Sequence, residues 1–326
     1  MTAAAPAQLV NIQDLQVTFP QLEGSVLAVR GVSIHLDEGE SLGIVGESGS
    51  GKSVSCMALL RLLNSPPAKV EASRLEIAGV EVTRVSRAEL SRLRGGVAAM
   101  IFQDPMTAFD PSYRIGYQII ETIRSHRGTQ KKAAWAEALR LLERVQIQNA
   151  EAILDSHPHQ LSGGMLQRAM IAMALSCQPR LLIADEPTTA LDVTVQAQIL
   201  QLIKALQEEL GMALIMITHD LGVVAETVDR VVVMYGGKVM ETAPVEDLFE
   251  APAHPYTEAL LGSIPGQNAG RGRLTEIPGS SPDPASPPSG CPFHPRCQVA
   301  EARCSASEPP FVALSPQRSA ACWRLP

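Results

Sequence analysis

The sequence predicts an α/β fold with a mainly parallel sheet, an antiparallel β region before it and a helical subdomain within it. Short apolar runs at residues 181–184, 212–217 and 231–234 are separated by helical stretches such as residues 193–210. This alternation is typical of a parallel sheet with helices on its faces. Residues 9–45 instead alternate apolar and polar positions over short stretches, which favours antiparallel strands.

The domain organisation follows from two changes of pattern along the chain. Residues 105–178 are predominantly helical in pattern and interrupt the sheet. Residues 263–290 contain six prolines and many Gly and Ser residues, so they lack the apolar side chains needed for a core and are interpreted as a linker or extended arm. We therefore expect one domain over residues 1–262, with the helical subdomain inside it, and a C-terminal extension over residues 263–326.

Composition narrows the class of protein. Hydrophobic residues make up 45% and charged residues 19% of the 326 residues, which is ordinary for a globular chain. The apolar run at residues 212–217 is far shorter than the roughly twenty residues that a membrane helix needs. The first residues lack the basic and apolar segments of a secretory signal, so we expect the protein to stay in the cytoplasm. A net charge of -7 without a Lys/Arg cluster argues against nucleic-acid binding.

A glycine-rich segment after a predicted strand carries the first functional signal. Residues 46–53 fit the pattern G-x-x-x-x-G-K-[ST], between a predicted strand at residues 41–45 and a predicted helix at residues 52–63. Glycines allow backbone N–H groups to converge on phosphate oxygens, and the helix N-terminus adds its positive dipole end. Lys52 supplies positive charge and Ser53 can coordinate magnesium, whereas the alternative is a simple glycine-rich turn. The candidate phosphate-binding residues are Gly46, Glu47, Ser48, Gly49, Ser50, Gly51, Lys52, Ser53 and Val54.

Two acidic residues follow the apolar run at residues 181–184. Open parallel sheets bind ligands beyond the carboxyl ends of their strands, which is where Asp185 and Glu186 are expected. Asp185 can support a magnesium shell, and Glu186 can orient or deprotonate an attacking water in phosphoryl transfer. The alternative, a solvated strand end, becomes less attractive beside a phosphate loop.

A third motif lies between the two. Residues 161–165 have the sequence LSGGM and are followed by Gln167 and Arg168, so a Ser cap and two glycines open a helix whose N–H groups can meet an anion. Alone, this pattern could be an ordinary helix start. The candidate residues are Leu161, Ser162, Gly163, Gly164 and Met165.

Over roughly residues 9–260, the ordered combination of these motifs resembles the ATPases of ABC transporters. The resemblance implies a P-loop NTPase of the ABC type that binds ATP with Mg²⁺ in a head-to-tail dimer, each phosphate loop facing the partner's LSGGM motif. It also implies roles for single residues. Gln103 would contact magnesium or the attacking water, His219 the terminal phosphate, and Asp192 would communicate across the dimer. Phe19 would stack on adenine, although it could equally be a core strand residue.

Further segments resemble the dipeptide and oligopeptide importer ATPases. These are QDPMTAFDP at residues 103–111, HPHQLSGGMLQR at residues 157–168, HPYT at residues 254–257 and the cysteine-bearing tail. The resemblance implies two membrane permease subunits, a second ABC ATPase subunit in a heterodimer or homodimer, and an extracytoplasmic substrate-binding protein that acts indirectly. It places the chain peripherally on the cytoplasmic face of the inner or plasma membrane.

Some features leave alternatives open. Leu166 stands where relatives carry a polar or basic residue, and Phe109-Asp110 where Leu and Asn are common, but neither change removes a phosphate or magnesium ligand. A non-transport ABC ATPase acting on nucleic acid or ribosomes would share the same motifs, because fold and motif do not fix the coupled task. An interaction module with a degenerate nucleotide site is disfavoured by the intact motifs.

The tail holds four of the six cysteines. Four thiols in a short cytosolic segment suggest a metal site, and spacings without C-x-x-C favour an iron–sulfur cluster over structural zinc. The resemblance to peptide-importer tails also implies a [4Fe-4S] cluster, with zinc or unligated thiols as alternatives. We expect a structural staple whose loss spares nucleotide binding. The candidate ligands are Cys291, Cys297, Cys304 and Cys322.

Overall fold

The structure, a computed structural model, describes residues 8–22, 24–189, 191–264 and 277–325. It divides into two compact units, each described by itself. The helical unit comprises Asp37–Glu40 and Arg84–Ile215. The loop unit comprises Gln8–Leu36, Ser41–Thr83 and the chain from residue 216 onwards, which includes the C-terminal tail.

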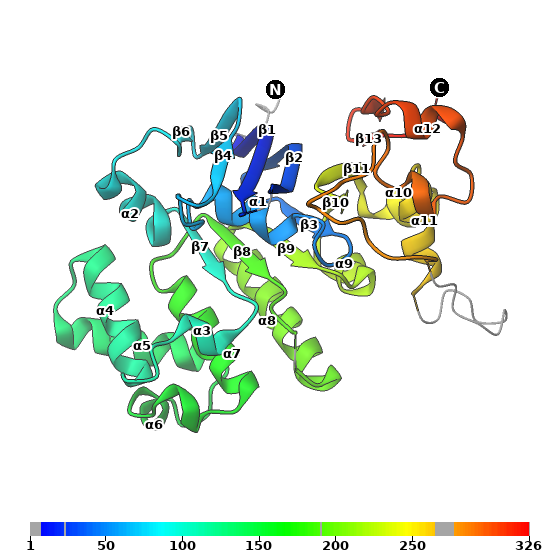
Figure 1. Cartoon of the computed structure of the whole chain (residues 1–326). Helices are drawn as coiled ribbons and strands as arrows, with labels where there is room; N and C mark the ends of the chain where they lie inside the picture. Colours follow the sequence, from blue (N-terminus) through cyan, green and yellow to red (C-terminus); the bar gives the residue numbers. More distant parts are fainter. Residues whose placement is uncertain (1–7, 23, 190, 265–276, 326) are drawn as a thin grey trace, which may run out of the picture. The chain divides into compact units, whose positions relative to one another are not determined.

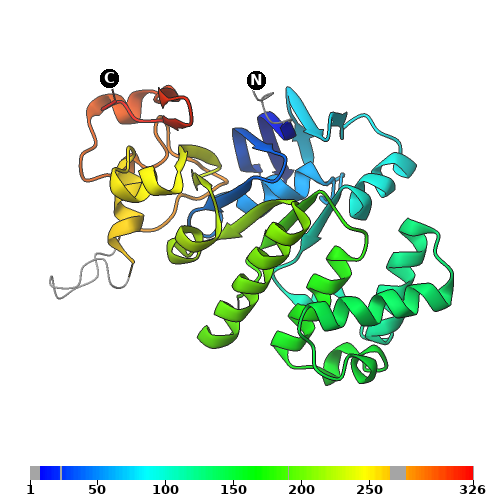
Figure 2. The ribbon, with the colours of Figure 1, turned by 180° about the vertical axis from the view of Figure 1, so that it is seen from behind.

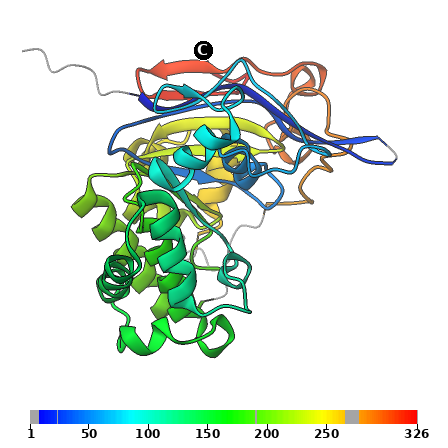
Figure 3. The same cartoon turned by 90° about the vertical axis from the view of Figure 1, so that its left-hand side faces the viewer.

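The loop unit begins with an antiparallel sheet, as the alternating pattern predicts. The long strand β1 pairs antiparallel with β4 and β5, and Val10 lies opposite Ile77. Alternate residues of β1 such as Leu15 and Val17 are fully buried, because one face of the sheet covers the core. Figure 3 shows β1 and β2 as long blue strands. The strands are β1 (Gln8–Pro20), β2 (Ser25–Asp37), β4 (Lys69–Glu71), β5 (Arg74–Ile77) and β6 (Val80–Glu81), in the order β2-β1-β5-β6.

A second set of strands in the loop unit positions the glycine-rich segment. The strands β3 (Ser41–Val45) and β10 (Arg230–Tyr235) pair in parallel and are buried along their whole length. On the other side of β10 lies β11 (Lys238–Pro244), which runs antiparallel to it. The helices of this unit are α1 (Lys52–Leu59), α9 (Leu221–Thr227), α10 (Val245–Glu250), α11 (Pro255–Gly262) and α12 (Ala302–Ala306).

Two differences from the sequence-based expectation concern this unit. The helix α1 ends at Leu59, before the predicted end at residue 63, because Arg61 adopts a left-handed conformation with φ 51°. The tail also contributes two short strands, β12 (Val312–Ser315) and β13 (Arg318–Ala320), and β13 pairs with β11. Figure 3 shows these two strands in red, side by side.

The helical unit combines parallel strands with a cluster of helices, as expected for residues 105–178. The strands β7 (Ala98–Ile101) and β8 (Leu181–Asp185) pair in parallel, and β9 (Ala213–Thr218) begins in this unit. Figure 1 shows α4, α5, α6 and α7 gathered together, and Figure 2 shows α8 as the longest green helix. The helices are α2 (Arg87–Gly96), α3 (Pro105–Ala108), α4 (Ile115–Arg127), α5 (Lys131–Arg144), α6 (Ala150–Leu154), α7 (Gly163–Leu175) and α8 (Val193–Leu210).

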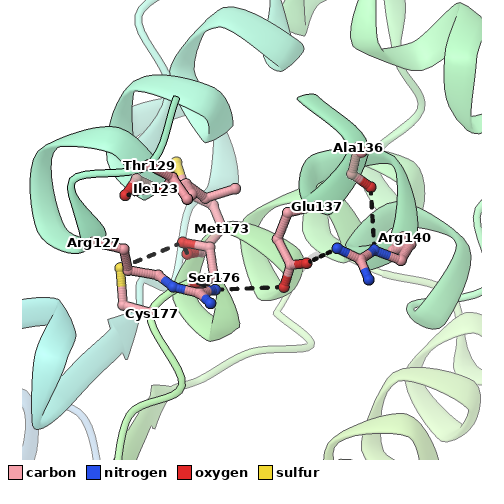
Figure 4. A network of polar contacts seen from close by, with 9 residues as sticks. All are labelled: Ile123, Arg127, Thr129, Ala136, Glu137, Arg140, Met173, Ser176 and Cys177. Carbon is pink, nitrogen blue, oxygen red and sulfur yellow. Dashed lines mark hydrogen bonds and ion pairs between the residues drawn. The ribbon is translucent and has the colours of Figure 1, made fainter. Parts of the chain in front are cut away.

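A polar network joins three helices of this cluster (Figure 4). Arg127, at the end of α4, contacts the Glu137 carboxylate of α5 at 3.4 Å and the Ser176 carbonyl beyond α7 at 3.3 Å. Glu137 also pairs with Arg140 at 2.5 Å. The Arg127 and Glu137 side chains are partly shielded from water, so this ion pair stabilises the packing of α4 against α5 more than a fully exposed pair would.

Among the residues that the structure describes, no helix is both long enough and apolar enough to cross a bilayer.

Candidate functional site

The glycine-rich segment follows β3 directly and opens α1, so the structure confirms the predicted strand, loop and helix. Lys52 is 5% exposed, and its Nζ donates to the carbonyl oxygens of Gly46 at 2.7 Å and Glu47 at 2.9 Å. The N-cap of α1 is Gly51, which provides no side-chain cap. Backbone N–H groups at a helix start together with a cation suit a phosphate group.

Two glycines of this loop are required by their surroundings. A Cβ on Gly46 would lie 2.1 Å from the Met234 carbonyl oxygen, and one on Gly51 would lie 2.5 Å from the Ala28 carbonyl oxygen. Gly51 also has φ 98°. Any side chain would therefore push the loop off its neighbours, whereas a Cβ on Gly49 would meet nothing within 4 Å. The loop is packed on its protein side and open at its tip, which fits a triphosphate bound over it.

The loop unit contains two further predicted residues. Phe19 lies near the end of β1 and is half-buried, so it is neither a core residue nor fully exposed. His219 follows β9 and is exposed, directly before Asp220, whose side chain caps α9 by accepting from the Gly222 N–H at 2.8 Å. The predicted contacts of Phe19 with adenine and of His219 with the terminal phosphate therefore stay predictions.

The acidic pair lies in the helical unit, at the carboxyl end of β8. Asp185 is buried and Glu186 is half-buried. Glu186 Oε2 accepts from Gln103 Nε2 at 3.1 Å and from Thr189 Oγ1 at 2.9 Å. The structure thus brings Gln103 and Glu186 together, as two predicted members of one site.

The backbone of Glu186 has φ 44°, which is unusual for a residue with a side chain. Such a conformation costs on the order of 1 kcal/mol and persists only when the surroundings enforce it. Here the buried strand β8 and the two hydrogen bonds to the carboxylate enforce it. With the backbone in this conformation, the Glu186 carboxylate lies within hydrogen-bonding distance of Gln103.

The LSGGM motif opens α7 as predicted. Ser162 is the N-cap and accepts from the Met165 N–H at 3.4 Å. A Cβ on Gly164 would lie 2.9 Å from Val195 of α8, and Asp192 caps α8 by accepting from the Val195 N–H at 3.0 Å. Gly164 thus approaches the side chain of Val195, and Asp192 holds the backbone N–H of the same residue. Leu166, the departure from relatives, is buried in the core, which explains why an apolar residue fits there.

The four tail cysteines share one environment. Together they line a cavity of about 20 Å³. Burial, with a smaller contribution from the neighbouring thiols, raises the pKa of the Cys291 thiol to about 11. Within the described ranges, however, no three Cys, His, Asp or Glu side chains are grouped so that they could hold a metal ion as they stand. The donor set of the predicted metal site is therefore gathered, but the site is not formed. The cysteines involved are Cys291, Cys297, Cys304 and Cys322.

Comparisons with known proteins decide the family. Residues 29–189 match the family model described as ABC transporter, and residues 240–304 match the model of the oligopeptide/dipeptide transporter C-terminal region. The chain is 48% identical to the dipeptide transport ATP-binding protein DppD of Escherichia coli, over 96% of both chains. The chain belongs to the ATP-binding subunits of the dipeptide and oligopeptide ABC transporters.

Other relatives agree with this assignment. The ABC ATPase is 46% identical to the oligopeptide transport ATP-binding protein OppD of Bacillus subtilis, over 98% of this chain and 89% of OppD. It also resembles a solved dimeric ATP-binding cassette bound to ADP and Pi, with 28% identity and a TM-score of 0.64, over 73% of this chain and 99% of that one. As a member of this family, the chain is an ATP-hydrolysing subunit.

Sequence reasoning missed a group of residues around the second residue of the phosphate loop. In this ABC ATPase the Glu47 N–H donates to Tyr256 Oη at 3.0 Å, and the Glu47 carboxylate pairs with Arg296 at 2.7 Å. Tyr256 belongs to the HPYT segment, which resembles the peptide importer ATPases. That resemblance marks the segment but does not indicate that Tyr256 contacts the loop. Nothing in the local pattern around Arg296 connects it with a loop some 250 residues earlier.

We predict that Glu186→Gln retains Mg-ATP binding but lowers ATP turnover by at least about a hundredfold, because it removes the carboxylate that we expect to position the attacking water. ATP should then hold the dimer closed, which size-exclusion chromatography with Mg-ATP would detect. The charge-matched control is Glu151→Gln on the exposed face of α6, which should leave turnover unchanged. Near-normal hydrolysis by Glu186→Gln would remove Glu186 from the catalytic role.

Proposed function

We propose that this ABC ATPase powers the import of dipeptides, oligopeptides or a related small cargo through two membrane permease subunits. The observation that carries the proposal is the extent of the similarity to DppD and OppD, which covers at least 96% of this chain and includes the tail. In this proposal the subunit lies peripherally on the cytoplasmic face of the membrane. It works with a second ATPase subunit of the same family and is supplied by an extracytoplasmic binding protein.

In the loop unit, the proposed task is to hold the nucleotide. The backbone N–H groups of residues 46–53 and the Lys52 ammonium bind the phosphates, and Phe19 stacks on adenine. Ser53 provides a magnesium ligand and His219 contacts the terminal phosphate. Support comes from the burial of Lys52 against the loop carbonyls and from the close packing of Gly46 and Gly51.

In the helical unit, the proposed tasks are catalysis and communication. Asp185 and Gln103 would complete the magnesium shell, and the bound ion would supply positive charge against the phosphate oxygens. Glu186 orients the attacking water, since its carboxylate is held by Gln103 and Thr189. The LSGGM residues meet the nucleotide held by the partner ATPase, and Asp192, which caps the neighbouring helix, transmits that contact.

We predict that ATP turnover depends on the membrane complex. Gln103 hydrogen-bonds to Glu186 and lies between β7 and α3, so a shift of the helical subdomain by the permease would move the catalytic carboxylate. Turnover in proteoliposomes should rise several-fold when cargo-loaded binding protein is added. Gln103→Ala should remove most of this stimulation, and Gln130→Ala, on the exposed start of α5, should leave it unchanged. Equal turnover by the free subunit and the loaded complex would contradict the proposal.

We further propose a metal centre in the tail, an iron–sulfur cluster with zinc as the alternative. Four soft sulfur donors line one cavity, which suits either group. The cavity of about 20 Å³ is close to the space of a single water molecule, so a cluster would require the cysteine segments to move apart. The proposed role is to hold the tail together, because metal binding can stabilise a segment with little core of its own.

We predict that anaerobically purified protein is brown and contains iron, and that serine at Cys291, Cys297, Cys304 or Cys322 removes the visible absorbance. Cys177→Ser in the helical unit should keep it, since that thiol lies beside Ser176 and not in the tail. Elemental analysis that finds stoichiometric zinc without iron would replace the cluster by zinc. Finding neither metal would refute the metal centre.

A further inference from the structure

The C-terminal tail holds the carboxylate of a phosphate-loop residue. Glu47 is the second residue of the loop, and its Oε2 accepts from Arg296 Nη1 at 2.7 Å and from Ser281 Oγ. Both donors lie in the extension after residue 263. The Arg296 side chain is 8% exposed and that of Glu47 is 24% exposed, so water screens this pair far less than it screens an ordinary surface pair.

Arg296 is itself fixed by contacts to each of its side-chain nitrogens. Nε donates to the Pro278 carbonyl at 2.8 Å, and Nη2 donates to the Ile277 carbonyl at 3.2 Å. Nη1 also donates to Tyr235 Oη at 3.1 Å, and the guanidinium lies 5.8 Å from the centre of the Tyr235 ring. A planar guanidinium held at every nitrogen presents its charge to Glu47 in one orientation, which a lysine could not do.

Aromatic packing anchors this part of the tail to the loop unit. Phe293 is buried against Tyr235 and Tyr256, with ring centres 5.3 Å and 5.1 Å apart. Tyr256 in turn accepts the Glu47 N–H at 3.0 Å, so both the backbone and the side chain of Glu47 are held by this cluster. The position of the loop residue is therefore determined by the tail as well as by β3.

We propose that Arg296 is a positioning residue for nucleotide binding, acting through Glu47. The inference rests on the proposed phosphate-binding role of residues 46–53. A carboxylate within that loop would repel the phosphates of ATP, and Arg296 compensates its charge and keeps the side chain directed toward the tail. The tail would then influence nucleotide binding through Arg296, separately from the predicted metal staple, whose loss we expect to spare nucleotide binding.

The test compares five variants of the full-length subunit by titration calorimetry with Mg-ATP, with kcat and KM measured in the assembled transporter. Arg296→Gln should weaken Mg-ATP binding and raise KM by about tenfold, while kcat stays within about twofold, because the catalytic carboxylate is untouched. Arg296→Lys should recover part of the affinity. The matched control is Arg303→Gln, also in the tail, whose partner is Glu301 and not the loop.

The fourth variant, the double variant Arg296→Gln/Glu47→Gln, separates charge compensation from tail folding. It removes the uncompensated carboxylate and should bind Mg-ATP within about threefold of Glu47→Gln alone. The proposal is overturned if Arg296→Gln binds Mg-ATP as tightly as Arg303→Gln, or if the double variant binds as weakly as Arg296→Gln.

If Arg296→Gln does not fold, Ser281→Ala carries the test: a KM raised about twofold or more supports the proposal, and an unchanged KM overturns it. Lys52→Ala, which should abolish binding, tests the role of the loop independently.

Discussion

The close approach of the glycine-rich loop to the end of β10 is the constraint on which the candidate nucleotide site of the loop unit depends. The strands β3 and β10 pair in parallel up to Val45 opposite Val233. The next residue of β3's chain, Gly46, therefore passes directly beside the Met234 carbonyl, at a separation that leaves no space for a side chain. Sheet register thus fixes where the loop starts, and the absence of a Cβ allows it to turn there.

The same strand end also connects the loop to the tail. Tyr235 follows Met234, and its hydroxyl meets Arg296 while its ring packs on Phe293. Burial raises the pKa of Tyr235, so its phenol stays protonated. The end of β10 therefore packs against the backbone of the loop and also contacts Arg296, which holds the Glu47 carboxylate. In the helical unit, the candidate catalytic residue is held by side-chain contacts instead. Glu186 has a backbone φ of 44°, and its carboxylate accepts hydrogen bonds from Gln103 and Thr189.

The parts of the fold and site that sequence predicts are those encoded in local patterns. The order of strand, loop and helix around Lys52, the cap Ser162 and the strand before Asp185 all follow from neighbouring residues. The docking of the tail could not be predicted in this way. The low apolar content around residues 277–290 indicates a linker, yet the segment is held by main-chain groups, such as the Pro284 carbonyl that accepts from the Leu27 N–H at 3.0 Å. Amino-acid composition gives no information about hydrogen bonds between main-chain groups.

The central claim is that the loop binds nucleotide because its backbone is packed against β10 without a side chain at position 46. Titration calorimetry of Gly46→Ala with Mg-ATP tests it most directly, with Gly262→Ala as the control, since a Cβ there would meet nothing within 4 Å. Thermal melting of both variants would show that the fold is retained. The account predicts that Gly46→Ala weakens Mg-ATP binding by at least about tenfold, because the loop must move to relieve the overlap. Binding by Gly46→Ala as tight as by Gly262→Ala would contradict it.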